Sequence, residues 1–173
     1  MAFTKIQTVS VTGSPSTVEF TAIPNTYKDL YVLTNFCNSS IGTAVARQEL
    51  RMTFNNNTSG YAQNRGYIYD GVPTVAGDSS TSLGYIAPAS ANSSGAGANY
   101  FSPMELHIFS YASNVANKTG HARGSAVSNT SATWVVGFTH FGWANTSAIS
   151  SIQFYFAVDN FVAGSTATLY GIS

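Results

Sequence analysis

The stretch Ile149-Ser-Ser-Ile152-Gln-Phe154-Tyr-Phe156-Ala-Val158, followed by Thr166-Ala-Thr-Leu169-Tyr-Gly-Ile172, carries an apolar side chain at nearly every second position. This period of two predicts β-strands, with Ile152, Phe154 and Phe156 on one face. Between the two runs lies Asp-Asn-Phe-Val-Ala-Gly-Ser (159–165), in which Asn and Gly favour turn conformations. We therefore predict a β-hairpin with a moderately long loop, which belongs to a closed β core completed by earlier strands.

The same alternation recurs through the rest of the chain. We expect further strands at 6–11, 17–22, 29–37, 48–54, 61–69, 101–111, 118–127 and 133–141. The strand 29–37 is apolar on both faces, which is typical of a central strand, whereas the Gly- and Ala-rich strand 118–127 is expected at an edge. With about eight to ten strands and no helical period, the fold class is all-β, an antiparallel two-sheet sandwich, and more narrowly a jelly roll.

The length of 173 residues suits one domain spanning 1–173. Between residues 70 and 99 the composition shifts to Ser, Ala, Gly, Asp and Pro, with only Leu83-Gly-Tyr85-Ile86 interrupting it. We expect a long loop excursion of small residues there. Because compact domains seldom keep such a loop without a use for it, we also expect it to contact a partner.

Charged residues make up only 8% of the chain, against about 25% in average proteins, and the seven basic residues balance the seven acidic ones. The basic residues are scattered, so we expect no nucleic-acid partner. A surface built from Ser, Thr, Asn and Gly is weakly protected against association. This composition suits a protein that is packed in an array, although a stable extracellular β domain would share it.

Features of export and membrane insertion are missing from the sequence. The lone Cys37 allows no internal disulfide, and its surroundings predict a buried small hydrophobe. The opening Met-Ala-Phe-Thr-Lys-Ile has no uninterrupted apolar stretch, and no run of about 18 apolar residues follows. We expect synthesis in a cytoplasm and no membrane partner.

Residues that could carry catalysis are few and dispersed. The carboxylates stand one per strand or loop, and Asp70 and Asp78 do not have the spacing of a calcium loop. His107 and His140 could meet across a sheet and hold a metal with Cys37, but no short-spaced ligand pair supports this, and outward polar positions are favoured. His121 stands alone in the sequence. We therefore expect no catalytic residue, no metal and no cofactor, and not an enzyme.

Tyrosines crowd the middle of the chain, and an aromatic residue opens it. Exposed tyrosine provides a rigid contact area at low entropic cost, although tyrosines also pack over the ends of sandwiches. The candidate interface residues are Phe3, Tyr67, Tyr69, Tyr85 and Tyr100.

Three segments resemble a β-sandwich protein found among the virion structural proteins of tailed bacteriophages. They are Phe20–Leu30 with its Ile-Pro-Asn turn, Leu50–Tyr61, and Asn160–Ile172, which is the most specific. With the stretches 108–111 and 149–152 they span almost the whole chain. Similar sequences place Gly-Asp after the Phe-Asn pair, whereas Asn56-Asn57 stand here, so a carboxylate role in that turn is not carried over to this chain.

The resemblance implies membership of a virion more than a particular task. Since the chain has no heptad shaft or collagen-like repeat, we expect a head decoration or cement protein on the outer capsid surface. It would stabilise the capsid by binding major capsid subunits, as a dimer or trimer with other copies of itself. The alternative is a tail-associated receptor-binding or fibre protein that contacts host surface glycans. A depolymerase is a third, weaker hypothesis.

Overall fold

The computed structural model describes residues 2–39, 48–78, 85–93, 101–127 and 134–173, with the backbone alone at 78, 85–93 and 127. The elements are β1 (Phe3–Ser10), β2 (Thr17–Phe20), β3 (Asp29–Asn38), β4 (Gln48–Phe54), β5 (Tyr61–Tyr69), β6 (Val72–Asp78), β7 (Tyr85–Ser93), β8 (Ser102–Phe109), β9 (Lys118–Val127), β10 (Trp134–Trp143), β11 (Ile152–Phe156) and β12 (Thr166–Ile172). The described part of the chain therefore consists of strands and their connections. It includes no helix of the length and apolarity that a membrane span requires.

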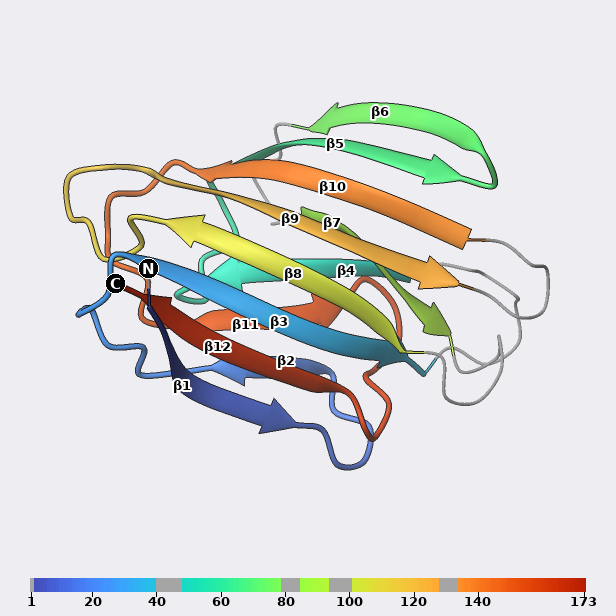
Figure 1. The fold of residues 1–173 in the computed structure, drawn as a ribbon, viewed down its shortest axis with the longest axis horizontal. Coiled ribbons are helices and arrows are strands. Elements are labelled where there is room, and N and C mark those ends of the chain that lie inside the picture. The colour runs from blue at the N-terminus through green and yellow to red at the C-terminus, as the bar shows by residue number, and fades with distance from the viewer. Residues whose placement is uncertain (1, 40–47, 79–84, 94–100, 128–133) are drawn as a thin grey trace.

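The strands form two layers, as Figure 1 shows. The first is an eight-stranded antiparallel sheet in the order β1-β12-β3-β8-β9-β10-β5-β6. The second is a three-stranded antiparallel sheet in the order β2-β11-β4. β7 links the layers, because it pairs antiparallel with β4 and briefly parallel with the end of β3. The prediction of an all-β, antiparallel two-sheet sandwich is confirmed.

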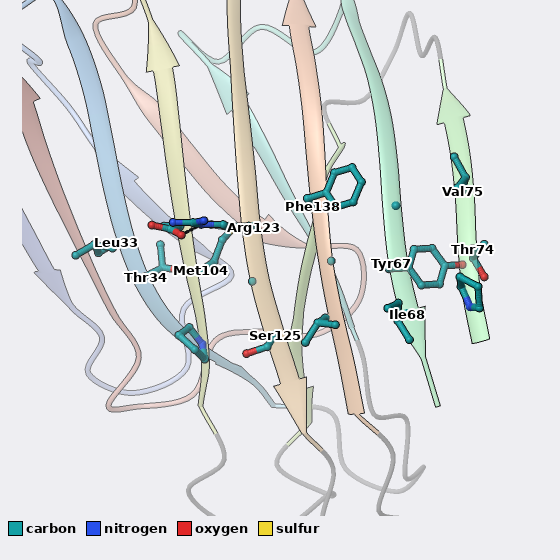
Figure 2. A pocket seen from close by; sticks show the side chains of 17 residues that line it. Leu33, Thr34, Tyr67, Ile68, Thr74, Val75, Met104, Arg123, Ser125 and Phe138 are labelled. Carbon is teal, nitrogen blue, oxygen red and sulfur yellow. Dashed lines mark ion pairs between the residues drawn. The ribbon is translucent and has the colours of Figure 1, made fainter. Parts of the chain in front are cut away.

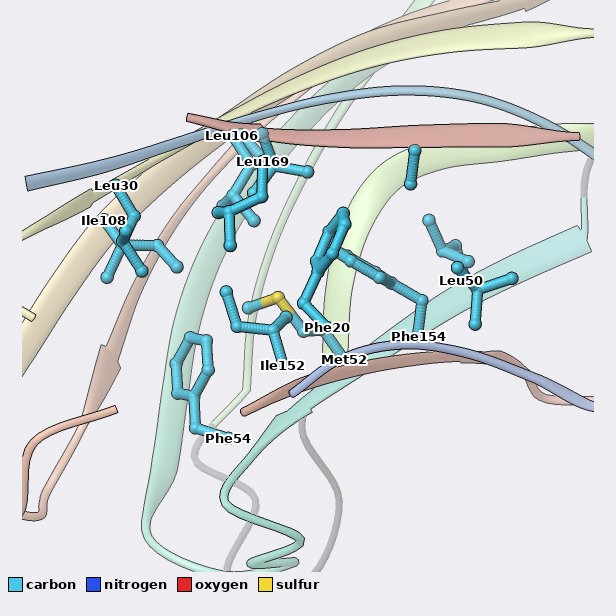
Figure 3. Close-up of a cluster of buried hydrophobic side chains, with 14 of the residues drawn as sticks. Phe20, Leu30, Leu50, Met52, Phe54, Leu106, Ile108, Ile152, Phe154 and Leu169 are labelled. Carbon is cyan, nitrogen blue, oxygen red and sulfur yellow. The ribbon is translucent and has the colours of Figure 1, made fainter. Parts of the chain in front are cut away.

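The core lies between the two sheets, where inward-facing side chains meet (Figure 3). The eight-stranded sheet supplies Leu30, Val32, Leu106, Ile108 and Leu169, and the three-stranded sheet supplies Phe20, Leu50, Met52, Phe54, Ile152 and Phe154, all at most 1% exposed. The predicted inward faces of the strands 48–54 and 101–111 are correct. Alternation thus placed the core side chains, as expected for two sheets packed face to face.

The predicted hairpin of the last two strands is wrong. β11 pairs with β2 and β4 in one sheet, whereas β12 pairs with β1 and β3 in the other. The connection 159–165 crosses between the sheets because Phe161 is completely buried, with its ring centroid 4.9 Å from that of Phe36 and 4.6 Å from that of Phe156. The buried Phe161 ring therefore favours a connection that crosses between the sheets. In a hairpin at the end of one sheet, this ring would be exposed.

The prediction that the strand 118–127 lies at an edge is also wrong. β9 lies between β8 and β10 in the middle of the large sheet. Its small residues reflect crowding. A Cβ on Gly120 would lie 2.4 Å from the backbone oxygen of His107 and 2.4 Å from the ring of Phe141. Ala122, at 1% exposure, faces the core beside it. Low apolar content in this strand therefore indicates close packing, not an edge.

The excursion expected at 70–99 contains two strands. Asp70 and Gly71, with φ of 49° and 79°, form a two-residue turn of the kind that Asp-Gly favours, and β6 then pairs with β5 along its whole length. β7 follows and pairs with β4. Residues 79–84 and 94–99 lie outside the described residues. A composition of small residues did not prevent strand formation, because neighbouring strands supply the hydrogen-bond partners.

Candidate functional site

One face of the large sheet points away from the core, and we call it the outer face. The strand register aligns its outward residues in rows, and one such row runs Leu33, Glu105, Arg123, Phe138, Gly66 and Val75 across β3, β8, β9, β10, β5 and β6. A second row places His107, His121 and His140 side by side on β8, β9 and β10. Residues far apart in the sequence therefore meet on one surface.

Large apolar side chains are exposed on the half of the outer face over β10, β5 and β6, which we call the apolar half. They are Ile68, Val75, Trp134, Val136 and Phe138, and Leu33 adds a sixth on β3, beyond the Glu105–Arg123 pair. Val75 is 85% exposed and Phe138 is 55% exposed. Neighbouring exposed apolar side chains of this size commonly mark a surface that binds another molecule.

A broad depression of about 730 Å³ lies in this face, and Figure 2 shows the side chains around it. Gly66 forms part of its floor, and a Cβ there would lie 2.8 Å from Cζ of Phe138. The Phe138 ring therefore rests against the backbone of β5 at Gly66, which is its cross-strand partner. This contact holds a large apolar ring in place while leaving most of it accessible.

A polar group borders the depression on the side of β8 and β9. The Tyr31 hydroxyl donates a hydrogen bond to Glu105. Arg123 forms an ion pair with the same carboxylate, which a dashed line marks in Figure 2. The Arg123 side chain is 70% exposed, and the Glu105 side chain is 26% exposed. The guanidinium, with its fork of donors, is thus presented at the rim of an apolar surface.

The three histidines occupy the middle of the outer face, so the predicted outward positions of His107 and His140 are correct. Their ring centroids lie 5.6 Å apart between His107 and His121 and 5.8 Å apart between His121 and His140. Nε2 of His107 lies 3.5 Å from Oδ2 of Asp29. His121, which the sequence left isolated, is the residue that joins the other two.

A metal site that combines the histidines with Cys37 is ruled out by distance. Tyr31 pairs with His107, and Cys37 is six residues further along β3, or about 20 Å at 3.3 Å per residue. Cys37 is buried, as predicted, and burial raises the pKa of its thiol to about 11. Across the described ranges, no three His, Cys, Asp or Glu side chains gather closely enough to hold a metal ion.

The pKa of His121 is lowered by burial and, to a lesser extent, by the neighbouring His107 and His140. The unfolded chain therefore takes up a proton on His121 at a higher pH than the folded chain does. The contribution of His121 to stability is complete above the unfolded pKa of 6.5 and is lost as the pH falls from there toward the folded pKa.

We expect the His121→Gln variant to lose less unfolding free energy than the unmodified protein between about pH 7.5 and about pH 5.5. The removed imidazole no longer takes up its proton on unfolding. Urea unfolding at the two pH values measures the difference, and the carboxylates common to both proteins cancel in the comparison. Equal losses in the two proteins would contradict the assignment.

The predicted interface residues are spread over several places. Phe3 is 54% exposed, and its ring packs edge-on against Tyr31 and Tyr170. Tyr67 lines the depression and is half-buried, as is Tyr69. Tyr85 begins β7 opposite Arg51, but its side chain lies outside the described residues, as does all of Tyr100.

The sequence did not single out Trp134, Val136 and Phe138, which dominate the apolar half. The sequence did contain a signal for this surface. Thr133–Phe141 is apolar on both faces, and burial in the core explains only one of the two faces.

Asp70 and Asp78, considered as a calcium pair, stand at opposite ends of β6. With about 3.3 Å per residue, that strand separates them by more than about 20 Å.

Comparisons with known proteins found no family model, no curated protein and no solved structure that matches this chain.

Proposed function

We propose that this chain is a structural protein of a bacteriophage virion. In this role it is a head decoration protein, which binds major capsid subunits at the outer surface of the shell as a dimer or trimer. The observation that carries the proposal is the apolar half of the outer face, where Trp134, Val136 and Phe138 stand exposed beside Ile68 and Val75. The resemblance of the sequence to virion proteins of tailed phages suggests that the partner of this surface is the major capsid protein.

The composition of the outer face is that of a protein-binding surface. Aromatic residues and arginine are enriched at the centres of interfaces, and polar groups surround them. Here Trp134 and Phe138 provide the apolar anchors, and the Arg123–Glu105 pair provides the polar border. The low charge of the chain also supports the proposal, because copies in a dense lattice do not repel one another.

The size of the outer face is adequate for a stable complex. Eight strands about 4.8 Å apart, each with about eight residues rising 3.3 Å, cover roughly 900 Å². A standard interface buries about 800 Å² on each partner. A protein that binds the assembled shell, and not its free subunits, stabilises the shell by mass action.

The location of the chain in virions tests the proposal. Virions are grown from the genome that encodes the chain, and quantitative mass spectrometry with electron cryo-microscopy then counts and locates the copies. We expect hundreds of copies on the head. A few copies, or a few dozen, at the tail would favour the receptor-binding alternative, and absence from the particle would contradict both.

Replacing Phe138 with Asp is expected to reduce the number of copies on the head by about tenfold or more, because a carboxylate would be buried without a partner. Val158→Asp is the matched control. Val158 is 58% exposed, but it lies on the connection that leaves the three-stranded sheet. Equal incorporation of the two variants would show that the outer face is not the docking surface.

A further inference from the structure

A second, smaller depression lies on the opposite side of the sandwich, over the outward face of the three-stranded sheet, and we call it the polar groove. It has a volume of about 290 Å³. Thr17, Thr53, Asn56, Gln153, Tyr155 and Asp159 line it. Nothing in the proposed docking of the outer face involves these residues.

The strand register brings the polar groove together from separate parts of the chain. Gln153 on β11 pairs with Thr53 on β4, and Tyr155 pairs with Thr17 on β2. Because these residues alternate with Met52, Phe54 and Phe154 of the core, their side chains stand on the outward face. Two connections complete the groove, through Asn56 and Asp159.

Asn56 and Asp159 both have left-handed backbone conformations, with φ of 54° and 65°. Asn and Asp tolerate this conformation better than other non-glycine residues. The neighbouring Asn55 and Asn57 use their side-chain oxygens on backbone amides of Ser150 and Ser59, whereas Asn56 makes no side-chain hydrogen bond to another described residue. The Asn56 amide is therefore available to a ligand.

Thr53 is the most informative residue of the polar groove. Its side chain points outward, yet the residue is only 2% exposed, and its Oγ1 has no hydrogen-bond partner within the described chain. A buried hydroxyl without a partner is costly, and such groups are normally satisfied by protein, water or ligand. A change of the Thr53 χ1 rotamer would bring its Oγ1 to the groove, where a ligand would supply the missing partner.

We infer that the polar groove binds one ring of a neutral saccharide. Hydroxyls, two amides and a single carboxylate offer both donors and acceptors, as the hydroxyls of a sugar require. The Tyr155 ring offers an apolar surface for the C–H face of the sugar. Among the described residues no lysine or arginine lines the groove, and the neighbouring Arg51 is paired with Glu49, which disfavours a phosphate or another anion. The volume, near the lower limit of small-molecule sites, fits a single ring.

Saturation-transfer difference NMR tests the inference on the purified chain. The probes are glucose, galactose, mannose, N-acetylglucosamine and fucose, each as the free sugar and as its methyl glycoside, with methyl phosphate, whose methyl protons can report saturation transfer, as the anionic comparison. We expect at least one sugar to bind with a dissociation constant of about 1 mM, and methyl phosphate not to bind. Binding of both forms indicates recognition of a glycan terminus, and binding of the free sugar alone indicates a soluble sugar.

Thr53→Val separates ligand binding from a structural role. It removes the hydroxyl with little change of shape, so we expect a Tm at least as high as that of the unmodified protein but binding weaker by about tenfold. Thr139→Val is the matched control, because Oγ1 of Thr139 is also buried without a described partner but lies outside the groove. Absence of any sugar signal, or equal binding by the two variants, would overturn the inference. The copy count in virions does not bear on this result.

Discussion

Replacing Lys118 with Met is expected to lower the free energy of unfolding by about 4 kcal/mol. Lys118 is completely buried, and its Nζ donates hydrogen bonds to the backbone oxygens of Ser113, Ala116 and Thr146 at 2.8, 2.7 and 3.0 Å. The three donors of the ammonium thus match three carbonyl oxygens. Methionine has a similar length, but it leaves all three oxygens without their partner.

The Lys118 contacts join the connection 110–117 to the segment after β10, so their loss loosens two parts of the chain together. Burial lowers the pKa of the Lys118 amino group, but the three carbonyl oxygens favour its charged form. Urea unfolding measures the change. Lys5→Met, on the exposed strand β1, is the control and should change stability by less than about 0.5 kcal/mol. Equal stabilities of the two variants would contradict this account.

Replacing Phe161 with Ala is expected to cost about 4 kcal/mol, the range seen when a buried phenylalanine is truncated. Phe161 lies in the connection between β11 and β12, and its ring packs against Phe36 of the large sheet and Phe156 of the small one. Its backbone N–H also donates to the Pro15 oxygen at 2.9 Å. The residue therefore holds both layers and the turn before β2.

Thermal and urea unfolding of Phe161→Ala should show the loss directly. Phe138→Ala makes the same chemical change at a ring that is 55% exposed, and it should cost less than about 1 kcal/mol. If the Phe161 connection were an ordinary surface loop, the two variants would be equally stable. A large difference between them would show that the Phe161 ring stabilises the connection that crosses the sandwich.

Much of the strand content followed from local pattern. In the strand 48–54 the alternation of Leu50, Met52 and Phe54 with polar residues left one possible inward face, and the structure has that face buried. The period of two is a property of neighbouring residues, so it can be read without knowing the partner strand. The same reasoning placed His107 and His140 outside the core.

The pairing of strands was decided by tertiary packing. Loop-closure entropy grows slowly with loop length, so a distant partner can compete with an adjacent one when it buries more apolar surface. β11 and β12 are adjacent in sequence but lie in different sheets, where each pairs with two distant strands and Phe161 is buried between the layers. Tertiary packing also explains β9. Its small residues allow close approach in the middle of the large sheet, and Lys118 at its start is buried.

The surfaces that could act on other molecules belong to tertiary structure entirely. Phe138, Gly66 and Val75 share a row only because β10, β5 and β6 are neighbours, and Thr53 lies opposite Gln153 only because β4 pairs with β11. The sequence by itself determined an all-β chain with few charged residues, zero net charge and an aromatic core. Which of its remaining side chains share a surface depended on register, a long-range property that alternation does not encode.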